Sequence, residues 1–286
     1  MALLDIEKLV GTSCRLCPRN CKLNRNIETG LCKTNNKIEI ASFNLHFGEE
    51  PPISGNYGSG TVFFAGCNMA CVFCQNYPIS QLKSAYKTID EYALADIFLE
   101  LQNRKAHNIN LVTPSHFVHL ICKSIGIARR KGFNIPVCYN TSSYDKPEII
   151  EYLKDFVDIY LADLKYADND LSYKYSGISD YFEVATKSIL KMQQTKGHLS
   201  IKNKIASSGL IIRHLVIPNN IGNSKKVLDW IASNIEHPTV SLMRQYFPAY
   251  KAFNYPEIAH KLVNYQWNEI LEYTDKLGID GYFQVA

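Results

Sequence analysis

The residues with the clearest chemical potential are three cysteines at C-x3-C-x2-C spacing: Cys67, Cys71 and Cys74. Thiolate is the ligand that iron–sulfur clusters take, so three such side chains can hold three irons of a [4Fe-4S] cluster. The fourth iron would then be open to a substrate. The alternatives are a structural zinc site with a borrowed fourth ligand or three buried thiols, but zinc motifs favour C-x2-C pairs in closed four-ligand sites.

Four further cysteines precede this motif at C-x2-C-x3-C-x10-C spacing: Cys14, Cys17, Cys21 and Cys32. In a reducing compartment such a set indicates metal binding or catalysis before disulfides. Four thiolates could close either a zinc site or an auxiliary iron–sulfur cluster, and the spacing does not separate the two. The last two of the nine cysteines, Cys122 and Cys138, are expected to be core thiols, because free cysteine behaves as a small hydrophobic side chain.

Length and composition describe a soluble globular protein. At roughly 150 residues per domain, a chain of 286 residues has about two domains. We predict a Cys-rich metal-binding module with a linker over residues 1–55 and a larger α/β domain over residues 56–286. The linker holds His46, Glu49 and Glu50, which would be either acid, base or substrate contacts at the mouth of that domain or solvated residues.

Charge and hydropathy narrow the choice of partners and compartment. The net charge of +4 is spread along the chain without a basic cluster, so a nucleic-acid partner has no support. The first seven residues, Met1 to Glu7, lack the basic and apolar regions of a signal peptide. No apolar run of about 18 residues follows. We therefore expect a cytoplasmic protein that does not cross a membrane.

Short β-type runs alternate with helical stretches from Thr61 onward. Strands separated by helix-length segments form βαβ units and hence a parallel sheet with right-handed crossovers. A closed eight-stranded barrel would need two more such units, and a Rossmann domain would need G-x-G-x-x-G after its first strand. The six predicted strands are residues 61–64, 108–112, 136–139, 158–161, 210–216 and 239–243.

Two helix starts are predicted within this alternation. Thr88 and Glu91 have the spacing of a capping box. Pro147 stands where the first residue of a helix belongs. After the capping box, apolar side chains recur at the spacing of one helical face: Leu94, Ile97, Phe98 and Leu101.

Polar residues follow the predicted strands at the points where these end. Barrels of alternating strands and helices build their sites at the carboxyl ends of the strands, so these are candidate site residues. Buried parallel strands are otherwise apolar, which gives the placement a physical reason. In chain order the candidates are Thr113, His116, Asn140, Thr141, Asp163, Lys165, Arg213 and Gln245.

The cysteine loop resembles that of the radical S-adenosylmethionine (radical SAM) superfamily, in which an aromatic residue, here Phe73, precedes the third cysteine. Residues 61–250 are similar to the pyruvate formate-lyase activating enzymes. Residues 46–54, 108–116 and 213–219 resemble more closely an uncharacterised branch, called pyruvate formate-lyase activating enzyme-like, that also carries N-terminal cysteines. The family fold is a partial (β/α)6 TIM-like barrel, which agrees with six predicted strands.

The resemblance implies roles for individual residues. The three clustered cysteines match the cluster ligands, and Phe73 matches the aromatic residue beside the adenine of S-adenosylmethionine. Arg213 matches a basic position near the methionine carboxylate, which suits a guanidinium fork. Three others match segments that contact the ribose and methionine moieties and, in activating enzymes, a monovalent cation: Asn140, Thr141 and Asp163.

The chain departs from the activating enzymes at two of these places. After the second strand those enzymes carry Gly-Gly-Glu, which binds the methionine amino group, whereas residues 111–116 read Leu-Val-Thr-Pro-Ser-His. Asn140 replaces an aspartate and removes a charge from the expected cation site. Recognition of the amino group is therefore open, and His116 could be either a substrate contact or a hydrogen-bonded structural residue.

The implied function is that of a radical SAM oxidoreductase, pyruvate formate-lyase activating enzyme-like. A reduced cluster would cleave S-adenosylmethionine to a 5′-deoxyadenosyl radical, which abstracts hydrogen from a substrate. By analogy the substrate would be a glycyl radical enzyme, and a flavodoxin- or ferredoxin-type protein would supply the electron. Such a cluster is oxygen-sensitive, so we expect function in anaerobic cells. The alternatives are a radical enzyme modifying a peptide or small molecule, such as an epimerase, and a non-catalytic iron–sulfur or zinc protein.

Overall fold

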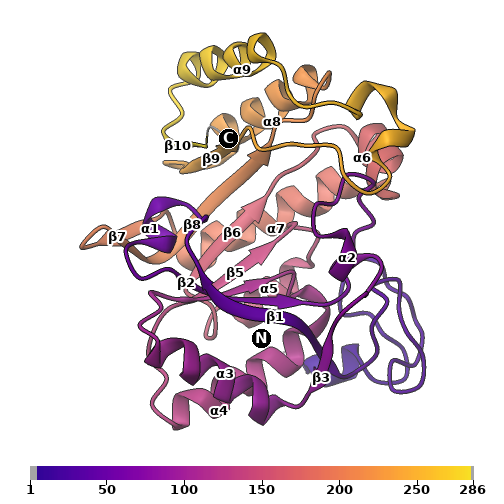
Figure 1. Cartoon of the computed structure of the whole chain (residues 1–286), viewed down its shortest axis with the longest axis vertical. Helices are drawn as coiled ribbons and strands as arrows, with labels where there is room; N and C mark the ends of the chain where they lie inside the picture. The colour runs from indigo at the N-terminus through magenta and orange to yellow at the C-terminus, as the bar shows by residue number, and fades with distance from the viewer. Residues whose placement is uncertain (1–4, 285–286) are drawn as a thin grey trace.

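The structure, a computed structural model, describes residues 5–284; residues 1–4 of the predicted N-terminal module lie outside this range. Its centre is a sheet in which seven of the described strands run parallel (Figure 1). In spatial order these are β10 (Gly281–Gln284), β9 (Val240–Met243), β8 (Ile205–Leu215), β6 (Ile159–Asp163), β5 (Val137–Thr141), β4 (Ile109–Val112) and β2 (Ser59–Phe64).

This sheet confirms the predicted fold class, an α/β fold built as a partial barrel. All six predicted strands are present, as β2, β4, β5, β6, β8 and β9. The parallel strand β10 was not predicted. It lies at one edge of the sheet, and the opposite edge is formed by other strands, so the barrel is not closed.

The sheet extends beyond β2 through antiparallel strands. The strand β1 (Ile38–His46) pairs with β2, and β3 (Lys87–Ile89) pairs with β1. On the other side, β7 (Ser200–Lys202) forms a hairpin with β8. Part of the segment predicted as the N-terminal module and linker, residues 38–46, therefore belongs to the main sheet.

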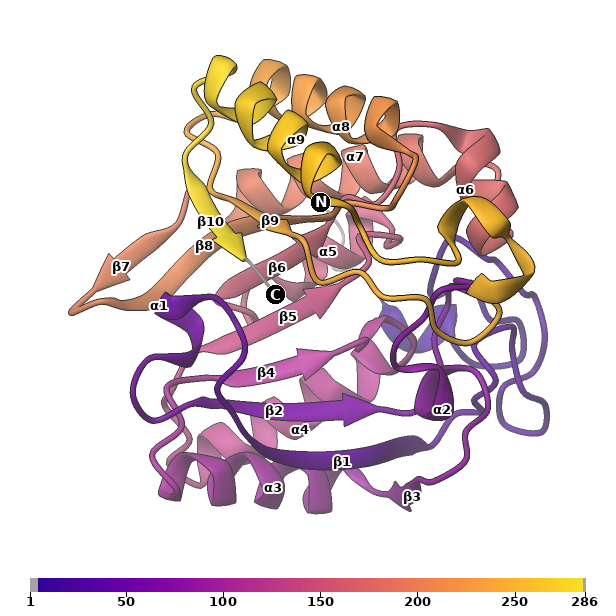
Figure 2. The ribbon, with the colours of Figure 1, turned by 45° about the horizontal axis from the view of Figure 1, so that its top comes forward.

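Helices cover the outer face of the sheet, with α3 and α4 beside β2 and β4 and with α7, α8 and α9 beside β8 to β10 (Figure 2). No helix described within residues 5–284 has both the length and the apolar character that crossing a membrane requires. The longer helices are α3 (Glu91–Asn103), α4 (Val118–Arg130), α5 (Pro147–Leu153), α6 (Asn169–Ser176), α7 (Tyr181–Lys196), α8 (Ile221–Asn234) and α9 (Asn264–Lys276). Short helical turns are α1 (Pro51–Ser54), α2 (Tyr77–Ser80), Ile6–Leu9, Ser115–Phe117, Ala252–Asn254 and Pro256–Ile258.

The two predicted helix starts have different outcomes. Pro147 begins α5, as predicted. The predicted capping box at Thr88 is wrong, because Thr88 lies in β3 and the N-cap of α3 is Asp90, whose carboxylate accepts the Ala93 N–H at 2.8 Å. Aspartate caps a helix N-terminus as well as threonine does, so the spacing of Thr88 and Glu91 was misleading. The predicted apolar face of the helix is correct, since Leu94, Phe98 and Leu101 are fully buried.

The turn α1 closes the barrel interior at the end where the strands begin. Ile53 packs there against Cys138 of β5 and Ile159 of β6 in a small inner cluster. Its carbonyl also accepts a hydrogen bond from the Asn108 side chain at 2.8 Å. Cys122 lies instead in the outer core beneath the helices. Both cysteines predicted as core thiols are therefore buried.

Three histidines are buried and hydrogen-bonded, and they make the fold sensitive to acid. Burial lowers the pKa of His116 to about 3, of His119 to about 3 and of His214 to about 4. In the unfolded chain each would take up a proton near its ordinary pKa of about 6.5. The unfolded state then binds up to three more protons than the folded state, so stability is retained above pH ~6.5 and is lost as the pH falls toward 4.

We therefore expect urea unfolding to show a lower free energy of unfolding at pH 5 than at pH 7.5. In the native protein, the NMR signals of these three rings should not titrate between those two values. A native-state titration near pH 6.5 would contradict the burial described above.

Candidate active site

The loop that follows β2 carries the three clustered cysteines at the end of the sheet where the parallel strands finish (Figure 2). The chain turns there at Gly66, whose φ is +80°. A side chain at this position would place its Cβ 2.3 Å from the carbonyl oxygen of Cys32, so only glycine fits. The turn thus packs the loop against the N-terminal cysteine segment.

The three thiols of this loop lie close enough to influence one another. Burial raises the pKa of Cys67, and negative charge on Cys71 or Cys74 would raise it further. Burial also raises the pKa of Cys71, whereas the nearby Lys165 ammonium acts in the opposite direction. A metal that binds these thiols would replace their protons and would stabilise the thiolate form.

Each of the three sulfur atoms has a hydrogen-bonding neighbour. The Met69 N–H donates to the Cys67 sulfur at 3.4 Å, and the Ser176 hydroxyl donates to Cys71 at 3.1 Å. The Cys74 sulfur lies 3.2 Å from the Ser80 hydroxyl. Hydrogen bonds to ligand sulfurs are one of the means by which proteins tune iron–sulfur clusters.

The donor type fits an iron–sulfur cluster. Among the described residues, no group of three or more His, Cys, Asp or Glu side chains is gathered to hold a single metal ion. Iron–sulfur clusters take one thiolate per iron, so their ligands stand around several metal atoms. Three neighbouring thiols on one loop satisfy that requirement and leave one iron of a [4Fe-4S] cluster without a protein ligand.

Phe73 is buried between two tyrosines near the cysteine loop. Its ring centroid lies 5.8 Å from that of Tyr246 and 6.4 Å from that of Tyr175. The same loop is fixed by two backbone hydrogen bonds of Val72, which donates to the Tyr175 carbonyl and accepts from the Lys251 N–H. Side chains after β9 and at the end of α6 therefore frame the position predicted to lie beside adenine.

A cluster of five charged side chains lies inside the barrel and reaches the cysteine loop through Lys165. Its members are Glu49, Glu50, Asp163, Lys165 and Arg213. Arg213 on β8 contacts three carboxylates: its guanidinium lies 3.0 Å from Glu49, 3.9 Å from Glu50 and 3.2 Å from Asp163. The Lys165 ammonium lies 2.5 Å from Asp163. Glu50 is fully buried and Glu49 nearly so. Of the two roles considered for the glutamates, the structure excludes that of solvated linker residues.

The charges of this cluster stabilise one another. Burial acts to raise the pKa of Asp163, but the positive charges of Lys165 and Arg213 outweigh it and lower that pKa. Burial acts to lower the pKa of Lys165, but Asp163 and then Cys71 raise it above the usual lysine value. Lys165 is thus a cation that faces both a carboxylate and the cysteine loop.

Thr113 and Thr141, two of the predicted site residues at strand ends, are fixed by hydrogen bonds. Thr113 has φ +60°, a left-handed conformation that is unusual for a β-branched residue. Its N–H donates to the Asn140 carbonyl at 3.0 Å, which joins the ends of β4 and β5. The Thr141 hydroxyl donates to the buried Asp145 carboxylate at 2.5 Å. The Thr141 hydroxyl therefore fixes the loop after β5. Of the two predicted site residues on β5, Asn140 is the one that places an amide side chain at the end of the strand.

The other predicted residues lie in different surroundings. His116 is 1% exposed, and its Nε2 donates to the Ala65 carbonyl at 2.8 Å, so it corresponds to the hydrogen-bonded structural residue considered from the sequence. The Gln245 carbonyl accepts from the Gln75 side chain at 2.9 Å, beside the cysteine loop. His46 ends β1 and is half-buried. It is not part of the charged cluster.

Two functional contacts were missed from the sequence. Ser176 donates to Cys71 although 105 residues separate them. The Tyr181 hydroxyl donates to the Ser142 carbonyl at 2.8 Å and accepts the Lys165 N–H at 3.0 Å, so it ties the ends of β5 and β6 together. Neither residue lies in a motif, and no local pattern identifies them.

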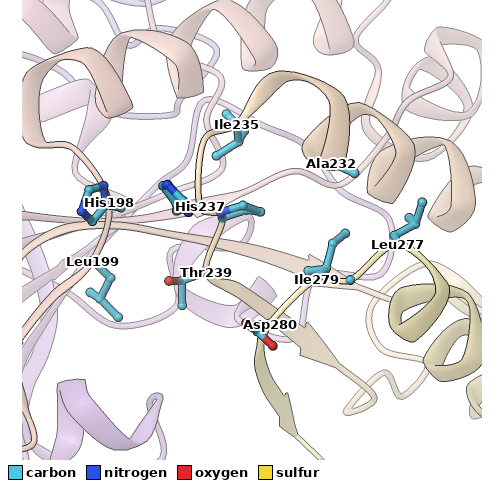
Figure 3. Close-up of a pocket in the computed structure, with 11 residues that line it drawn as sticks. His198, Leu199, Ala232, Ile235, His237, Thr239, Leu277, Ile279 and Asp280 are labelled. Atoms are coloured by element: carbon cyan, nitrogen blue, oxygen red, sulfur yellow. The ribbon is translucent and has the colours of Figure 1, made fainter.

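The pocket in Figure 3 lies at the opposite end of the barrel. It has a volume of about 540 Å³ and is lined by segments that precede β7, β9 and β10, among them His198, His237 and Asp280. The rings of the two histidines lie 5.8 Å apart, and both are exposed. Barrels of this architecture perform chemistry at the carboxyl ends of their strands, so we do not assign the reaction to this pocket.

Comparison with known proteins identifies the superfamily that this site resembles. The radical SAM superfamily model matches residues 61–201. Methanocaldococcus jannaschii has an uncharacterised protein, MJ0674, that is 33% identical over 286 residues, covering 97% of this chain and 78% of that protein. A second uncharacterised protein of that organism, MJ0808, is 22% identical over 263 residues, covering 85% and 73% of the two chains.

Solved structures show the same fold at low identity. Streptococcus suis SuiB bound to precursor peptide SuiA superposes with a TM-score of 0.54 and 14% identity, covering 77% of this chain and 47% of the SuiB chain. The chain thus spans about half the length of SuiB. A spore photoproduct lyase has a TM-score of 0.50 and 11% identity, covering 77% of this chain and 74% of that one.

Proposed function

This chain belongs to the radical SAM superfamily, and on that premise we propose that it generates a 5′-deoxyadenosyl radical to abstract hydrogen from a protein or peptide. The observation that carries the proposal is the cysteine loop: three neighbouring thiols at the carboxyl end of the barrel, each with a hydrogen-bonding neighbour. A [4Fe-4S] cluster held by these thiols would supply the electron that cleaves the sulfonium of S-adenosylmethionine.

The residues around the loop would bind and orient the two groups. Cys67, Cys71 and Cys74 would hold the cluster, and Lys165 would place a positive charge near Cys71. Phe73 would lie beside adenine, and Thr113, Asn140, Thr141 and Gln245 would line the remainder of the site. Arg213 is already engaged by three carboxylates, so we propose that it positions Asp163 and Glu49 instead of binding the methionine carboxylate.

A monovalent cation is not part of this proposal. The activating enzymes that the chain resembles would use such a cation near Asp163. Here Asp163 already lies against the ammonium of Lys165 and the guanidinium of Arg213, which neutralise its charge. The replacement of aspartate by Asn140 removes a further negative charge.

A protein or peptide substrate is supported by the surface around the cysteine loop. The segment after β9 contacts the loop through Lys251, and it exposes Phe247 and Phe253. Tyr173 of the neighbouring α6 is also exposed. Exposed aromatic side chains of this kind are enriched at protein interfaces. The structural likeness to SuiB, a protein bound to a precursor peptide, is compatible with a peptide substrate.

Within this class, the resemblance to activating enzymes makes a glycyl radical enzyme one candidate substrate, and a flavodoxin- or ferredoxin-type protein the proposed electron donor. A variant that cleaves S-adenosylmethionine but forms no product would instead favour an epimerase-like reaction in which the chain returns a hydrogen atom. A protein that binds no S-adenosylmethionine would be the non-catalytic alternative.

Electron paramagnetic resonance tests the proposal directly. We expect the anaerobically reconstituted, reduced protein to give a cluster signal that changes when S-adenosylmethionine is added, because the ligand occupies the open iron. The variant with Cys67, Cys71 and Cys74 replaced by alanine is the control and should show no such change. If S-adenosylmethionine does not change the cluster signal of the wild type, the proposed function is contradicted.

A further inference from the structure

The proposed reaction does not use the four N-terminal cysteines. They occupy a segment that has little regular structure and few apolar side chains of its own. Between residues 11 and 37 the described chain forms turns and bends without a helix or strand. Two of its few large apolar side chains are exposed, Ile27 by 81% and Leu31 by 63%. Small modules of this kind usually require a metal or disulfides for stability, and these cysteines are free.

Backbone contacts bring the four cysteines together. The Cys14 N–H donates to the Leu23 carbonyl and the Lys22 N–H donates to the Cys14 carbonyl, both at 2.8 Å, which places Cys14 beside the Cys21 end of the turn. A Cβ at Gly30 would lie 3.3 Å from the Cys32 sulfur and 3.7 Å from the Cys21 sulfur. Both sulfurs therefore border the same glycine.

Cys17 completes the set. The Asn20 N–H donates to the Cys17 carbonyl at 3.1 Å, which turns the chain directly before Cys21. Cys17 and Cys21 therefore lie on one turn, and the hydrogen bond between Lys22 and Cys14 joins that turn to Cys14.

The two cysteine sets are also joined directly. The Cys67 N–H donates to the Cys32 carbonyl at 3.2 Å, so a ligand of one set is hydrogen-bonded to a ligand of the other. Arg19, between Cys17 and Cys21, donates to the Asn68 carbonyl at 2.8 Å. A short route of covalent and hydrogen bonds thus connects the N-terminal cysteines to the loop of the proposed reaction.

We propose that Cys14, Cys17, Cys21 and Cys32 bind a second iron–sulfur cluster that passes single electrons to the first. Four thiolates leave no iron open to a ligand, so this centre serves electron transfer and not substrate binding. A flavodoxin- or ferredoxin-type donor loses one electron, and the first cluster gains it through this centre. Zinc has no redox chemistry, so a zinc ion at these cysteines would stabilise the segment but could not pass electrons through the contact between Cys32 and Cys67.

The test uses the variant in which Cys67, Cys71 and Cys74 are all alanine, because it leaves the N-terminal segment intact. After anaerobic reconstitution with iron and sulfide, we expect about half of the wild-type iron, since each cluster takes its own set of cysteines. The reduced variant should give a signal that S-adenosylmethionine does not change. Retention of zinc alone, or of no metal, would overturn the proposal.

A second pair of variants tests the assignment of ligands. Cys17→Ser should lower the iron content of the triple-alanine background, whereas Cys122→Ala, a buried thiol of the outer core, should not. Equal iron in both would overturn the assignment. The electron-transfer role of the second cluster rests on the proposed function, but the binding of that cluster does not. If the wild-type resonance signal does not change with S-adenosylmethionine while the triple-alanine variant retains iron, the proposed function is contradicted and the second cluster is not.

Discussion

Replacement of Cys71 by alanine is expected to reduce the formation of 5′-deoxyadenosine to the background of protein without a cluster. The change removes one of three thiolates and leaves two irons without protein ligands, and it also deprives the Ser176 hydroxyl of its sulfur partner. The product can be measured by chromatography after incubation with S-adenosylmethionine and dithionite. Iron content, measured on the same samples, shows whether cluster binding is lost.

Cys122→Ala provides the matched control for this change. Cys122 is 3% exposed and Cys71 is 8% exposed, so both thiols are buried, but Cys122 lies on α4 and not on the loop. We expect this variant to lose some stability, since a buried side chain is shortened, and to keep cleavage. If the Cys71 variant still cleaves S-adenosylmethionine, the loop does not hold the reactive cluster.

The sheet could be predicted largely because its central strands are local, apolar runs between helices. The strand β10 was missed because its residues, Gly-Tyr-Phe-Gln, do not form an apolar run and its place depends on pairing with β9. The role of β1 was missed for a related reason, because the strand with which a segment pairs cannot be identified from that segment's own sequence. Pairing over a long separation is a property of the whole fold.

The three cysteines of the loop could be recognised as a unit because metal ligands on one loop follow a characteristic spacing, and the structure brings their side chains together. The charged cluster could not be assembled in the same way. Glu49 and Arg213 are separated by 164 residues, and only the turn α1 brings the glutamates into the barrel. From the sequence, Glu49 and Glu50 were equally compatible with a solvated linker, because two acidic residues before a Pro-Pro pair give no indication of burial.

Thr113 has a backbone conformation that its residue type does not predict. The activating enzymes have glycines near this position, and the loss of Gly-Gly-Glu left recognition of the methionine amino group open. Thr113 nevertheless adopts the left-handed conformation that glycine takes easily. Strained backbone of this kind is often found at functional sites, where the surrounding structure holds it in place.

Replacement of Arg213 by methionine is expected to destabilise the protein by about 3–5 kcal/mol at neutral pH, because it leaves buried carboxylates without their positive partner. Lys165 would still pair with Asp163, but Glu49 would keep only the Asn110 amide, at 2.9 Å. The penalty exists only while the carboxylates are charged. The loss relative to the wild type should therefore shrink as the pH falls from 7.5 to 5, which urea unfolding at the two values would measure.

Two further variants separate this charge effect from the loss of packing. Arg130→Met removes an exposed guanidinium from α4 and should change the free energy of unfolding by no more than about 0.5 kcal/mol. Glu49→Gln in the Arg213→Met background removes one uncompensated charge with little change in shape, so it should restore part of the stability at pH 7.5 and less at pH 5. If the double variant is no more stable than Arg213→Met at either pH, the arginine acts through packing alone.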